Sequence, residues 1–463
     1  GATLRLSSQA SLPIQTQKSL SALDSGGNPY YTNGVFEVVD LRLSRPDTNS
    51  TSGIMGILEL DDSRVTNLVL NRSIGSTRTA DIFRVTAGTN SACTLELNAS
   101  ISLKGHLSGS NAANGGGYVI LRGTNRIQGL NGLLLERGGR ILIGGPHCVA
   151  ADPDAGTWAP ITFLDDSGYA RFGLAPEVTG EVTISNAVFA NTNSTGTNRH
   201  AAFLLSTNSV NGAAQVLRLA GPVGGVGGLR LASPGNGDPG CLYLSPGNTY
   251  EGGTRIGTGK IFVPSADAMG NGNSLKPASL GLIRFETRSD SHLVCTADID
   301  FPTTHSVAVS GNSMANIDTM DRAVLWRGSI INYDTDTNGI GGHLRKLGSG
   351  SLTLLGTNGY TGITRVSQGA LVVGDPASLP SNNRVQFGPS GTLRLSAVGS
   401  YSIGSISPVV ITNSVGTTNT ETMAGILDLG VSGVNVTVAS LPVWPADRKS
   451  TRLNSSHEWI SRM

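Results

Sequence analysis

The sequence is poor in charged and aromatic residues. Asp, Glu, Lys and Arg make up 14% of its 463 residues and aromatic residues 5%, whereas globular chains carry about 25% charged residues. No apolar run approaches the roughly 18 residues of a membrane-spanning helix. Segments rich in Glu, Lys and Ala are also scarce. These scarcities argue against a helical protein and exclude a helical membrane span.

Cysteine is equally scarce. The four cysteines, Cys93, Cys148, Cys241 and Cys295, form no C-x-x-C pair. Their wide spacing fits neither a zinc site nor a compact disulfide scaffold. We expect buried single thiols, although the even count leaves disulfides open.

Glycine, by contrast, is abundant, at 62 of 463 residues, about twice the usual share. There is no strict Gly-X-Y period, so a collagen helix is excluded. The hydrophobic content of 38% is too high for a disordered chain. What remains is a long, polar, turn-rich β protein.

The stretch Asp447–Met463 differs from the rest. Its opening, DRKSTRLNSSH, resembles the conceptual translation of a short-read sequencing adapter. We therefore interpret 447–463 as a non-native tail and expect it to pack against nothing. A Trp459 side chain buried in a well-packed core would contradict this interpretation.

Without the tail, which holds four basic and two acidic residues, 29 basic and 30 acidic residues remain. The balance offers no excess of positive charge to indicate a nucleic-acid partner. The start, GATLRLS, has no Met and matches GTLRLS at Gly391–Ser396. We expect a fragment that is truncated at both ends.

Internal repeats organise residues 1–446. Residues 242–285 align without a gap with residues 352–395, and twelve of the 44 positions are identical. A weaker copy lies at 119–144. Each copy holds short L-x-L or V-x-V pairs separated by Gly, Asn, Ser or Thr, and this period of two is typical of strands with one buried face.

The apolar pairs recur about every 19 to 22 residues with no helical segment between them, and this spacing predicts an all-β solenoid, a parallel β-helix in which each coil stacks on the last. We expect the following pairs to form inward columns of successive coils: Leu352/Leu354, Leu371/Val373 and Leu393/Leu395; Leu242/Leu244, Ile261/Val263 and Ile283/Phe285; Val119/Leu121, Ile141/Ile143 and Ile161/Phe163. Arg284 and Arg394 fall between apolar positions and should point into water.

The stretch LRKLGSGSLTLLGTNGYTGITRVSQGALVVGDPASLP, residues 344–380, resembles the autotransporter-associated β-strand repeat. The positions on the repeat pattern are Leu344, Lys346, Gly348, Gly350, Leu352, Leu354, Gly356, Asn358, Tyr360, Thr361, Gly362, Thr364, Val366, Gly369, Leu371, Val373 and Gly374. The copy at 242–263 keeps the N-T-Y-x-G-G-T core but lacks the leading Lys-Gly part. In the copy at 119–144, Ile127 stands where the Tyr should be.

The resemblance implies a right-handed, single-stranded parallel β-helix, exported by a bacterium and displayed on its surface or secreted as a passenger fragment. Such repeats carry no catalytic residues, metal or cofactor of their own. The resemblance leaves the partner as an unknown extracellular ligand or surface glycan, and a membrane anchor or β-barrel is expected in the full-length protein.

Two motifs hint at other chemistry. Asp334–Gly339 reads D-x-D-x-N-G, the opening of a calcium loop, but Arg345 stands where the closing Glu belongs. We therefore interpret it as a polar turn. Gly311–Ala315, GNSMA, resembles the nucleophile segment of subtilases, yet no H-G-x-H segment supplies a base for Ser313.

Paired carboxylates could serve a β-helical polysaccharide lyase or hydrolase. The candidates are Asp61/Asp62, Asp165/Asp166 and Asp298/Asp300, and none of these pairs recurs beside another at coil spacing with a paired Arg or Lys. The histidines outside the tail share no motif that indicates a metal site: His106, His147, His200, His292, His305 and His343.

We therefore expect a surface-displayed β-helix scaffold, a stalk, spacer or adhesin-like module without hydrolase or lyase activity. The alternative is a carbohydrate-active β-helix enzyme whose site lies in 150–235 or 286–340. A cleft lined by three or more charged side chains on one face would favour the enzyme.

Overall fold

The computed structural model describes residues 2–6, 31–32, 35–38, 53–60, 67–70, 74–76, 81–86, 94–97, 101–103, 106–110, 117–128, 132–136, 138–152, 156–164, 170–190, 200–232, 240–270, 282–286, 291–408, 410–412, 418–420 and 425–440. The chain divides into two compact units, Gly1–Gly252 and Gly253–Met463, which we describe separately. Within the described ranges, no helix has the length and hydropathy needed to cross a membrane. The tail 447–463, with Trp459, lies outside these ranges, so its predicted lack of packing stays a prediction.

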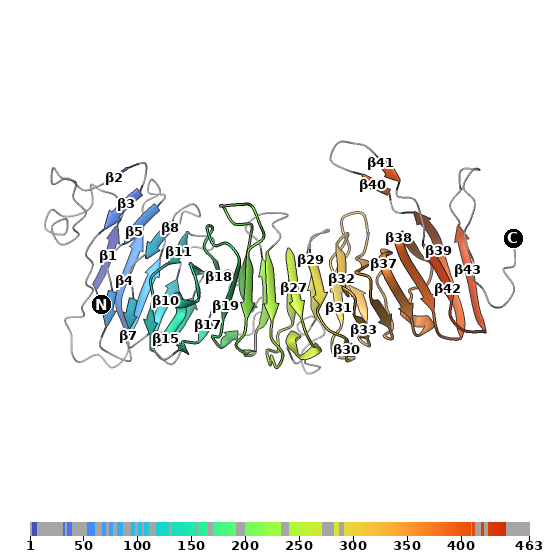
Figure 1. Ribbon diagram of the computed structural model, residues 1–463, viewed down its shortest axis with the longest axis horizontal. Helices are drawn as coiled ribbons and strands as arrows, with labels where there is room; N and C mark the ends of the chain where they lie inside the picture. The colour runs from blue at the N-terminus through green and yellow to red at the C-terminus, as the bar shows by residue number, and fades with distance from the viewer. Residues whose placement is uncertain are drawn as a thin grey trace. The chain divides into compact units, whose positions relative to one another are not determined.

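In unit 1, successive strands of the chain join three sheets in a repeating order (Figure 1). The first sheet consists of β1 (Ala2–Leu6), β4 (Gly53–Leu60), β7 (Asp81–Thr86), β10 (His106–Ser110), β13 (Leu133–Glu136), β17 (Ile161–Phe163), β20 (Val188–Ala190) and β23 (Val223–Gly224). The second consists of β2 (Tyr31–Thr32), β3 (Val35–Val38), β5 (Asn67–Leu70), β8 (Thr94–Leu97), β11 (Tyr118–Leu121), β14 (Arg140–Ile143), β18 (Arg171–Leu174), β21 (His200–Leu204) and β24 (Gly228–Ala232). Pairing within both sheets is parallel except between β2 and β3.

The third side of unit 1 consists of β6 (Ile74–Ser76), β9 (Ile101–Leu103) and β12 (Arg126–Ile127), and later of β19 (Glu181–Ile184), β22 (Val216–Leu219) and β25 (Cys241–Leu244). A 3-10 turn, η2 (Pro146–Val149), and the antiparallel pair β15 (Ala150–Asp152) and β16 (Thr157–Trp158) interrupt the repeating order. Because one turn supplies one strand to each side and the strands pair in parallel, unit 1 is a three-sided parallel β-helix.

The core of unit 1 is a set of apolar columns inside the coil. One column in the second sheet is defined by direct register partners, all at most 2% exposed: Leu95, Val119, Ile141, Phe172, Phe203 and Leu231. Full burial of each large apolar side chain contributes about 1.5–3 kcal/mol. The continuous column is therefore a main source of the stability of the stack.

Unit 2 has the same three-sided plan. One sheet consists of β26 (Thr254–Ile256), β28 (Ile283–Phe285), β31 (Val307–Val309) and β34 (Ile330–Asn332). A second consists of β27 (Gly259–Val263), β29 (Ser291–Cys295), β32 (Met314–Asp318), β35 (His343–Leu347), β37 (Ile363–Val373), β38 (Asn383–Leu395), β39 (Gly399–Pro408) and β43 (Val434–Ser440). The third side consists of β30 (Ile299–Phe301), β33 (Ala323–Trp326) and β36 (Ser351–Leu354), which then pairs with β37, and it ends in β42 (Ile426–Leu429).

The long strands β37 and β38 serve two sides of unit 2 at once. The first half of β37 pairs with β35 and the second half with β36, and the register between β37 and β38 shifts between Val366 and Gln368. Gly369 follows this irregularity with φ +63°, and a Cβ there would clash with the Gly350 carbonyl oxygen. Only glycine fits such a close approach. The turns η3 (Ala266–Met269) and η4 (Pro376–Ser378) and the antiparallel hairpin β40 (Val410–Thr412) and β41 (Thr418–Thr420) complete the described elements.

The parallel β-helix predicted from the sequence is confirmed, and so are several of its columns. Leu352 pairs with Leu371 in the next turn of the coil, and Leu371 pairs with Leu393 in the turn after it. In unit 1, Val119 pairs with Ile141, as the spacing predicted. Their side chains are buried as expected.

Two of the nine predicted pairs were assigned to the wrong column, Ile161/Phe163 and Ile283/Phe285. Ile161 and Phe163 pair with Leu133 and Leu135 in the first sheet of unit 1. The coil that follows Ile141 is longer than predicted, because the residue that pairs with Ile141 in the next turn is Phe172.

Ile283 and Phe285 likewise pair with Thr254 and Ile256. The strand that continues the column of Ile261 and Val263 is β29, with Leu293 and Cys295. All three sides of the coil carry similar alternating apolar pairs, so spacing alone misassigned the side.

The two outward arginines differ in their surroundings. The Arg394 side chain is 51% exposed and its Nε lies 2.7 Å from Asp428 Oδ2, as predicted for an outward position. Arg284 also points outward, but its side chain is only 19% exposed. Its guanidinium carbon lies 3.4 Å from the centroid of the Tyr333 ring, and this cation–π contact replaces part of the predicted contact with water.

Candidate functional site

The most specific side-chain arrangement in the chain belongs to the repeat signature. Asn358 sits at a corner of the coil and is 7% exposed. Its Oδ1 accepts a hydrogen bond from Ile330 N, 2.7 Å away in the preceding coil, and its Nδ2 donates to Ser378 O at 2.6 Å in the following coil. One amide thus joins three successive coils, and it satisfies backbone groups that burial would otherwise leave without partners.

Buried asparagines also bond to the backbone of other coils in unit 1. Asn125 is fully buried, accepts from Ile101 N at 2.9 Å and donates to Cys148 O at 2.7 Å. Asn248 accepts from Val223 N at 2.8 Å, and Asn186 donates to two carbonyl oxygens of earlier residues. The Asn of the repeat therefore has a structural role at the corners of the coil.

The Tyr and Thr of the signature form a second buried link. The Tyr360 ring is fully buried, and its hydroxyl lies 2.5 Å from Thr364 Oγ1. Thr364 N donates to Asn383 Oδ1 at 3.1 Å, and Asn383 Nδ2 donates to Gly362 O at 2.8 Å. Burial raises the pKa of Tyr360 well above its ordinary value, so the phenol stays neutral.

Lys346 is the unexpected member of the signature. It occupies an inward position of β35 between Ile317 and Val366 of the neighbouring strands, and it is 0% exposed. Its Nζ donates to the carbonyl oxygens of Leu347 at 2.7 Å, Gly348 at 2.8 Å and Gln368 at 3.2 Å. The alternation L-x-K in the sequence was the available signal, because it places the lysine on the same face as buried Leu344.

Two of these carbonyl groups, those of Leu347 and Gly348, lie at a tight turn, and the third belongs to the neighbouring strand β37. Gly348 has φ +78°, and a Cβ there would clash with Met320 N. The lysine binds the carbonyl groups that the turn leaves inside the coil. Lys346 therefore stabilises this corner of the coil through its hydrogen bonds.

The pH dependence of stability tests this role. Burial lowers the pKa of Lys346 to about 8, against about 10.4 in the unfolded chain. Between these values the unfolded chain binds more protons, so the free energy of unfolding should rise with pH relative to Lys346→Met. We expect the difference between wild type and variant to change by about 2–3 kcal/mol between pH 8 and 10.5.

Denaturant unfolding of both proteins across this range measures the effect. Both proteins should carry Cys295→Ala, because Lys346 and Cys295 shift each other's pKa. Subtracting the two curves then removes the contribution of Tyr360, which titrates in both. A difference that stays flat with pH would show that Lys346 remains an ammonium ion in the folded coil.

Charged side chains on the outward faces pair between coils. Arg218 contacts Glu181 with two hydrogen bonds, at 2.5 and 3.1 Å, and its guanidinium carbon lies 4.3 Å from the centre of the Tyr243 ring. The Arg218 guanidinium lowers the pKa of Glu181. The hydrogen bonds of Arg327 lower the pKa of Asp300 in the same way. Because water screens exposed pairs of this kind, each contributes little to stability.

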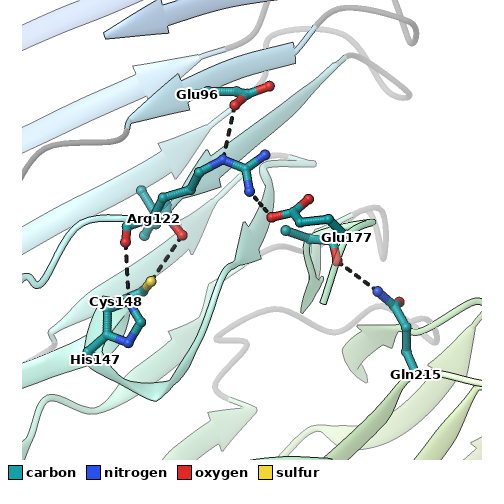
Figure 2. Close-up of polar contacts among 8 residues, drawn as sticks. Glu96, Arg122, His147, Cys148, Glu177 and Gln215 are labelled. Atoms are coloured by element: carbon teal, nitrogen blue, oxygen red, sulfur yellow. Dashed lines mark hydrogen bonds and ion pairs between the residues drawn. The ribbon is translucent and has the colours of Figure 1, made fainter. Parts of the chain in front are cut away.

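A denser polar group surrounds Arg122 in unit 1 (Figure 2). Its Nε lies 3.0 Å from Glu96 Oε2, and its other side forms an ion pair with Glu177. His147 Nε2 donates to Arg122 O at 3.2 Å, and Cys148 Sγ donates to Leu121 O at 3.0 Å. One arginine pairs with both carboxylates, and the thiol donates to a backbone carbonyl. These contacts join neighbouring coils, so the group has a structural role.

The D-x-D-x-N-G segment, which we interpreted as a polar turn, is a hydrogen-bonded turn. Asp334 Oδ1 accepts from Gly311 N at 2.6 Å. Asp336 Oδ1 accepts from Asn338 N at 2.9 Å and from Ile340 N at 2.7 Å. Within the described part of the chain, no three His, Cys, Asp or Glu side chains gather as metal ligands.

Ser313 has a histidine in the adjacent coil, which the sequence did not indicate. Ser313 is 2% exposed, and its carbonyl oxygen accepts from His343 N at 2.8 Å. His343 Nδ1, however, accepts from Ile363 N at 2.7 Å, so the ring proton resides on Nε2. In a Ser-His-Asp triad the histidine donates its Nδ1–H to the aspartate, and this tautomer has no proton on Nδ1.

In the acidic pair that the structure describes, Asp298 and Asp300 bind different partners. Asp298 Oδ1 accepts from Ala323 N at 2.8 Å. Asp300 accepts from Arg327 Nε and NH2 at 2.7 and 2.8 Å, a basic partner that the sequence did not indicate. Asp61/Asp62 and Asp165/Asp166 lie outside the described residues.

The remaining histidines and the cysteines are dispersed. His305 is 5% exposed, and burial lowers its pKa. Cys148 and Cys295 are buried free thiols, as predicted, and burial raises the pKa of Cys295 to about 12. Cys241 is half-buried, and Cys93 lies outside the described residues.

The coil and its recurring asparagine corners define the class of protein, a parallel β-helix built from sequence repeats. Residues 238–261 and 344–373 match the family described as passenger-associated-transport-repeat, and the matches fall on two of the copies found in the sequence. Two segments of the chain therefore carry the passenger-associated transport repeat. This family is of the scaffold type and implies a location at the cell surface or outside the cell. No curated protein and no solved structure gives a significant match to the chain.

Proposed function

We propose that the chain is a surface-displayed stalk, a spacer that holds other parts of its passenger away from the cell. The observation that carries this proposal is the use of the signature residues. Asn358, Tyr360 and Lys346 are all buried in the coil. Asn358 and Lys346 form hydrogen bonds to neighbouring turns, and Tyr360 bonds to Thr364 of the same signature. A repeat whose most specific residues serve stacking is suited to building length.

The proposal includes the absence of catalysis. In the one candidate carboxylate pair that the structure describes, Asp300 is bonded to Arg327 and Asp298 to a backbone N–H. Glycoside chemistry needs two carboxyl groups set across a bond, with one of them protonated. The Arg327 guanidinium instead lowers the pKa of Asp300, which favours the ionised form.

A stalk should lengthen by one strand spacing for each added coil. Residues 371–392 form one complete turn, because Leu371 pairs directly with Leu393. Five extra copies of this turn, inserted before Leu393, should move a fluorophore at Asn338 about 24 Å further from a membrane to which the C-terminal end is tethered. Distance-dependent quenching by a dye in that membrane measures the displacement.

The matched control carries the same five copies with Asp in place of both inward residues, Leu371 and Val373, in every copy. These copies cannot bury their inward face, so they should not extend the stack. The proposal fails if the native copies leave the label where it was, or if native and control insertions move it equally.

A further inference from the structure

At the start of β37, a histidine side chain takes the place of a backbone carbonyl group. The N–H of Ile363, the first residue of the strand, donates to His343 Nδ1 at 2.7 Å. One position earlier, Gly362 N donates to the backbone oxygen of Gly342 at 3.0 Å, in the same preceding turn of the coil. The connection between β35 and β37 therefore includes a bond that depends on the ionisation state of a side chain.

The imidazole ring of His343 is held against this peptide group. His343 is half-buried, and its backbone N–H donates to Ser313 O at 2.8 Å in the coil before. A Cβ at position 362 would clash with His343 Nδ1. The ring therefore packs directly on the peptide between Gly362 and Ile363, and glycine leaves the room for it.

Only a neutral imidazole can accept this hydrogen bond. In the neutral ring one nitrogen is a donor and the other an acceptor, whereas both nitrogens of the imidazolium ion carry a proton. Protonation of His343 on Nδ1 would set two N–H groups against each other and leave the Ile363 N–H without its acceptor. A part-buried donor that loses its acceptor destabilises the fold, so the bond and the proton exclude each other.

The surroundings of the ring oppose its protonation at neutral pH. Burial is the first cause that lowers the pKa of His343, and the positive charges of Arg365 in β37 and Arg384 in β38 lower it further. Asp336, in the turn that precedes β35, acts in the opposite direction. The other charged or titratable residues on the neighbouring strands of this face and in this turn are His292, Asp318, Asp334 and Arg345. The bond to Ile363 is therefore intact at neutral pH and exposed to loss in acid.

We propose that His343 is an acid-sensitive joint between two coils of unit 2. When the ring takes up a proton on Nδ1, its bond to Ile363 N is lost and the start of β37 separates from β35. The buried bonds from Thr364 N to Asn383 Oδ1 and between Tyr360 and Thr364 lie next to this point, so the opening should reach the signature residues of the repeat. The inference goes beyond the proposed function, because stacking itself needs no response to pH.

Hydrogen exchange of the Ile363 amide in the full chain, measured from pH 7 to pH 4 and corrected for the intrinsic exchange rate, tests the proposal. The population of the neutral ring falls about tenfold for each pH unit below the pKa of the folded-state histidine, so the protection factor of Ile363 should fall by at least about tenfold over this range. The amide of Gly374, just beyond the end of β37, donates to Leu354 O and should lose much less protection.

Two substitutions at the same position give the limiting states of the joint. His343→Asn keeps an acceptor near the position of Nδ1 but cannot titrate, so protection at Ile363 should stay high down to pH 4. His343→Phe keeps a ring but removes the acceptor, so protection at Ile363 should already be low at pH 7. The matched control is His147→Asn, which changes an exposed histidine of unit 1 and should respond to acid as the wild type does.

Arg384→Gln distinguishes titration of the ring from general unfolding in acid. It removes, through an exposed side chain, one of the charges that oppose protonation of His343. The midpoint of the loss of protection at Ile363 should therefore move to higher pH. In the wild type, that midpoint should coincide with the titration of His343, followed by NMR of its ring nitrogens.

The proposal is overturned if the wild type keeps its protection at Ile363 down to pH 4, if His343→Asn loses protection as the wild type does, or if His343→Phe is protected like the wild type at pH 7. It is also overturned if the two wild-type midpoints differ by more than about one pH unit. If His343→Asn does not form the bond at pH 7, the wild-type midpoints and their shift in Arg384→Gln decide the question. None of these outcomes bears on the proposed stalk.

Discussion

Leu371→Asp is expected to lower the free energy of unfolding by about 4 kcal/mol or more. Leu371 is 0% exposed and sits in a column between Leu352 and Leu393, which are also fully buried. The register partners of this position are leucines, which offer a carboxylate neither a counter-charge nor a hydrogen bond, and burying an unpaired charge costs several kcal/mol. Because each turn is supported by its neighbours, the damage should spread to the adjacent turns.

The matched control for this prediction is the next residue along β37. Val372→Asp introduces the same charge at a half-buried outward position, opposite Arg394 in the next strand. It should change the free energy of unfolding by less than about 1 kcal/mol. Urea unfolding of both variants, with limited proteolysis to locate the opened coils, measures the contrast. Equal destabilisation by both variants would refute the inward column.

The period-two pattern was sufficient to predict the fold and to separate inward from outward residues. Val119, Leu352 and Leu371 are buried as expected, and Arg394 is exposed. The pattern could not assign each strand to its side, as Ile161 and Ile283 show. Alternating apolar pairs look alike on all three sides, and the lengths of the turns between them decide which strands become neighbours.

The same limit explains what the sequence left hidden about candidate sites. His343 and Ile363 are separated in the sequence by a full turn of the coil, and only the fold brings the imidazole ring to the backbone N–H. Ser313 and His343 meet for the same reason. Lys346 differs, because its inward position was visible in the alternation. Its three carbonyl partners depend on the turn at Gly348, which a residue pattern does not describe.

Asn358→Ala is expected to destabilise unit 2 by about 3 kcal/mol or more, because the change removes the amide that accepts from Ile330 N and donates to Ser378 O. It leaves both buried backbone groups without their partner, at about 1–3 kcal/mol each. The amide joins the preceding coil to the following coil. In Asn358→Ala we therefore expect these three coils no longer to unfold together in one cooperative transition.

Hydrogen exchange locates this effect. In Asn358→Ala, the amide of Ile330 should lose most of its protection, while amides of β43, further along the stack, should change much less. Asn338→Ala, in an exposed turn, is the matched control and should leave both sets of amides and the free energy of unfolding unchanged within about 0.5 kcal/mol. Unchanged protection at Ile330 in Asn358→Ala would show that another group replaces the amide. In that case the asparagine of the repeat would need a different explanation, one that depends on folding or export and not on the stability of the finished coil.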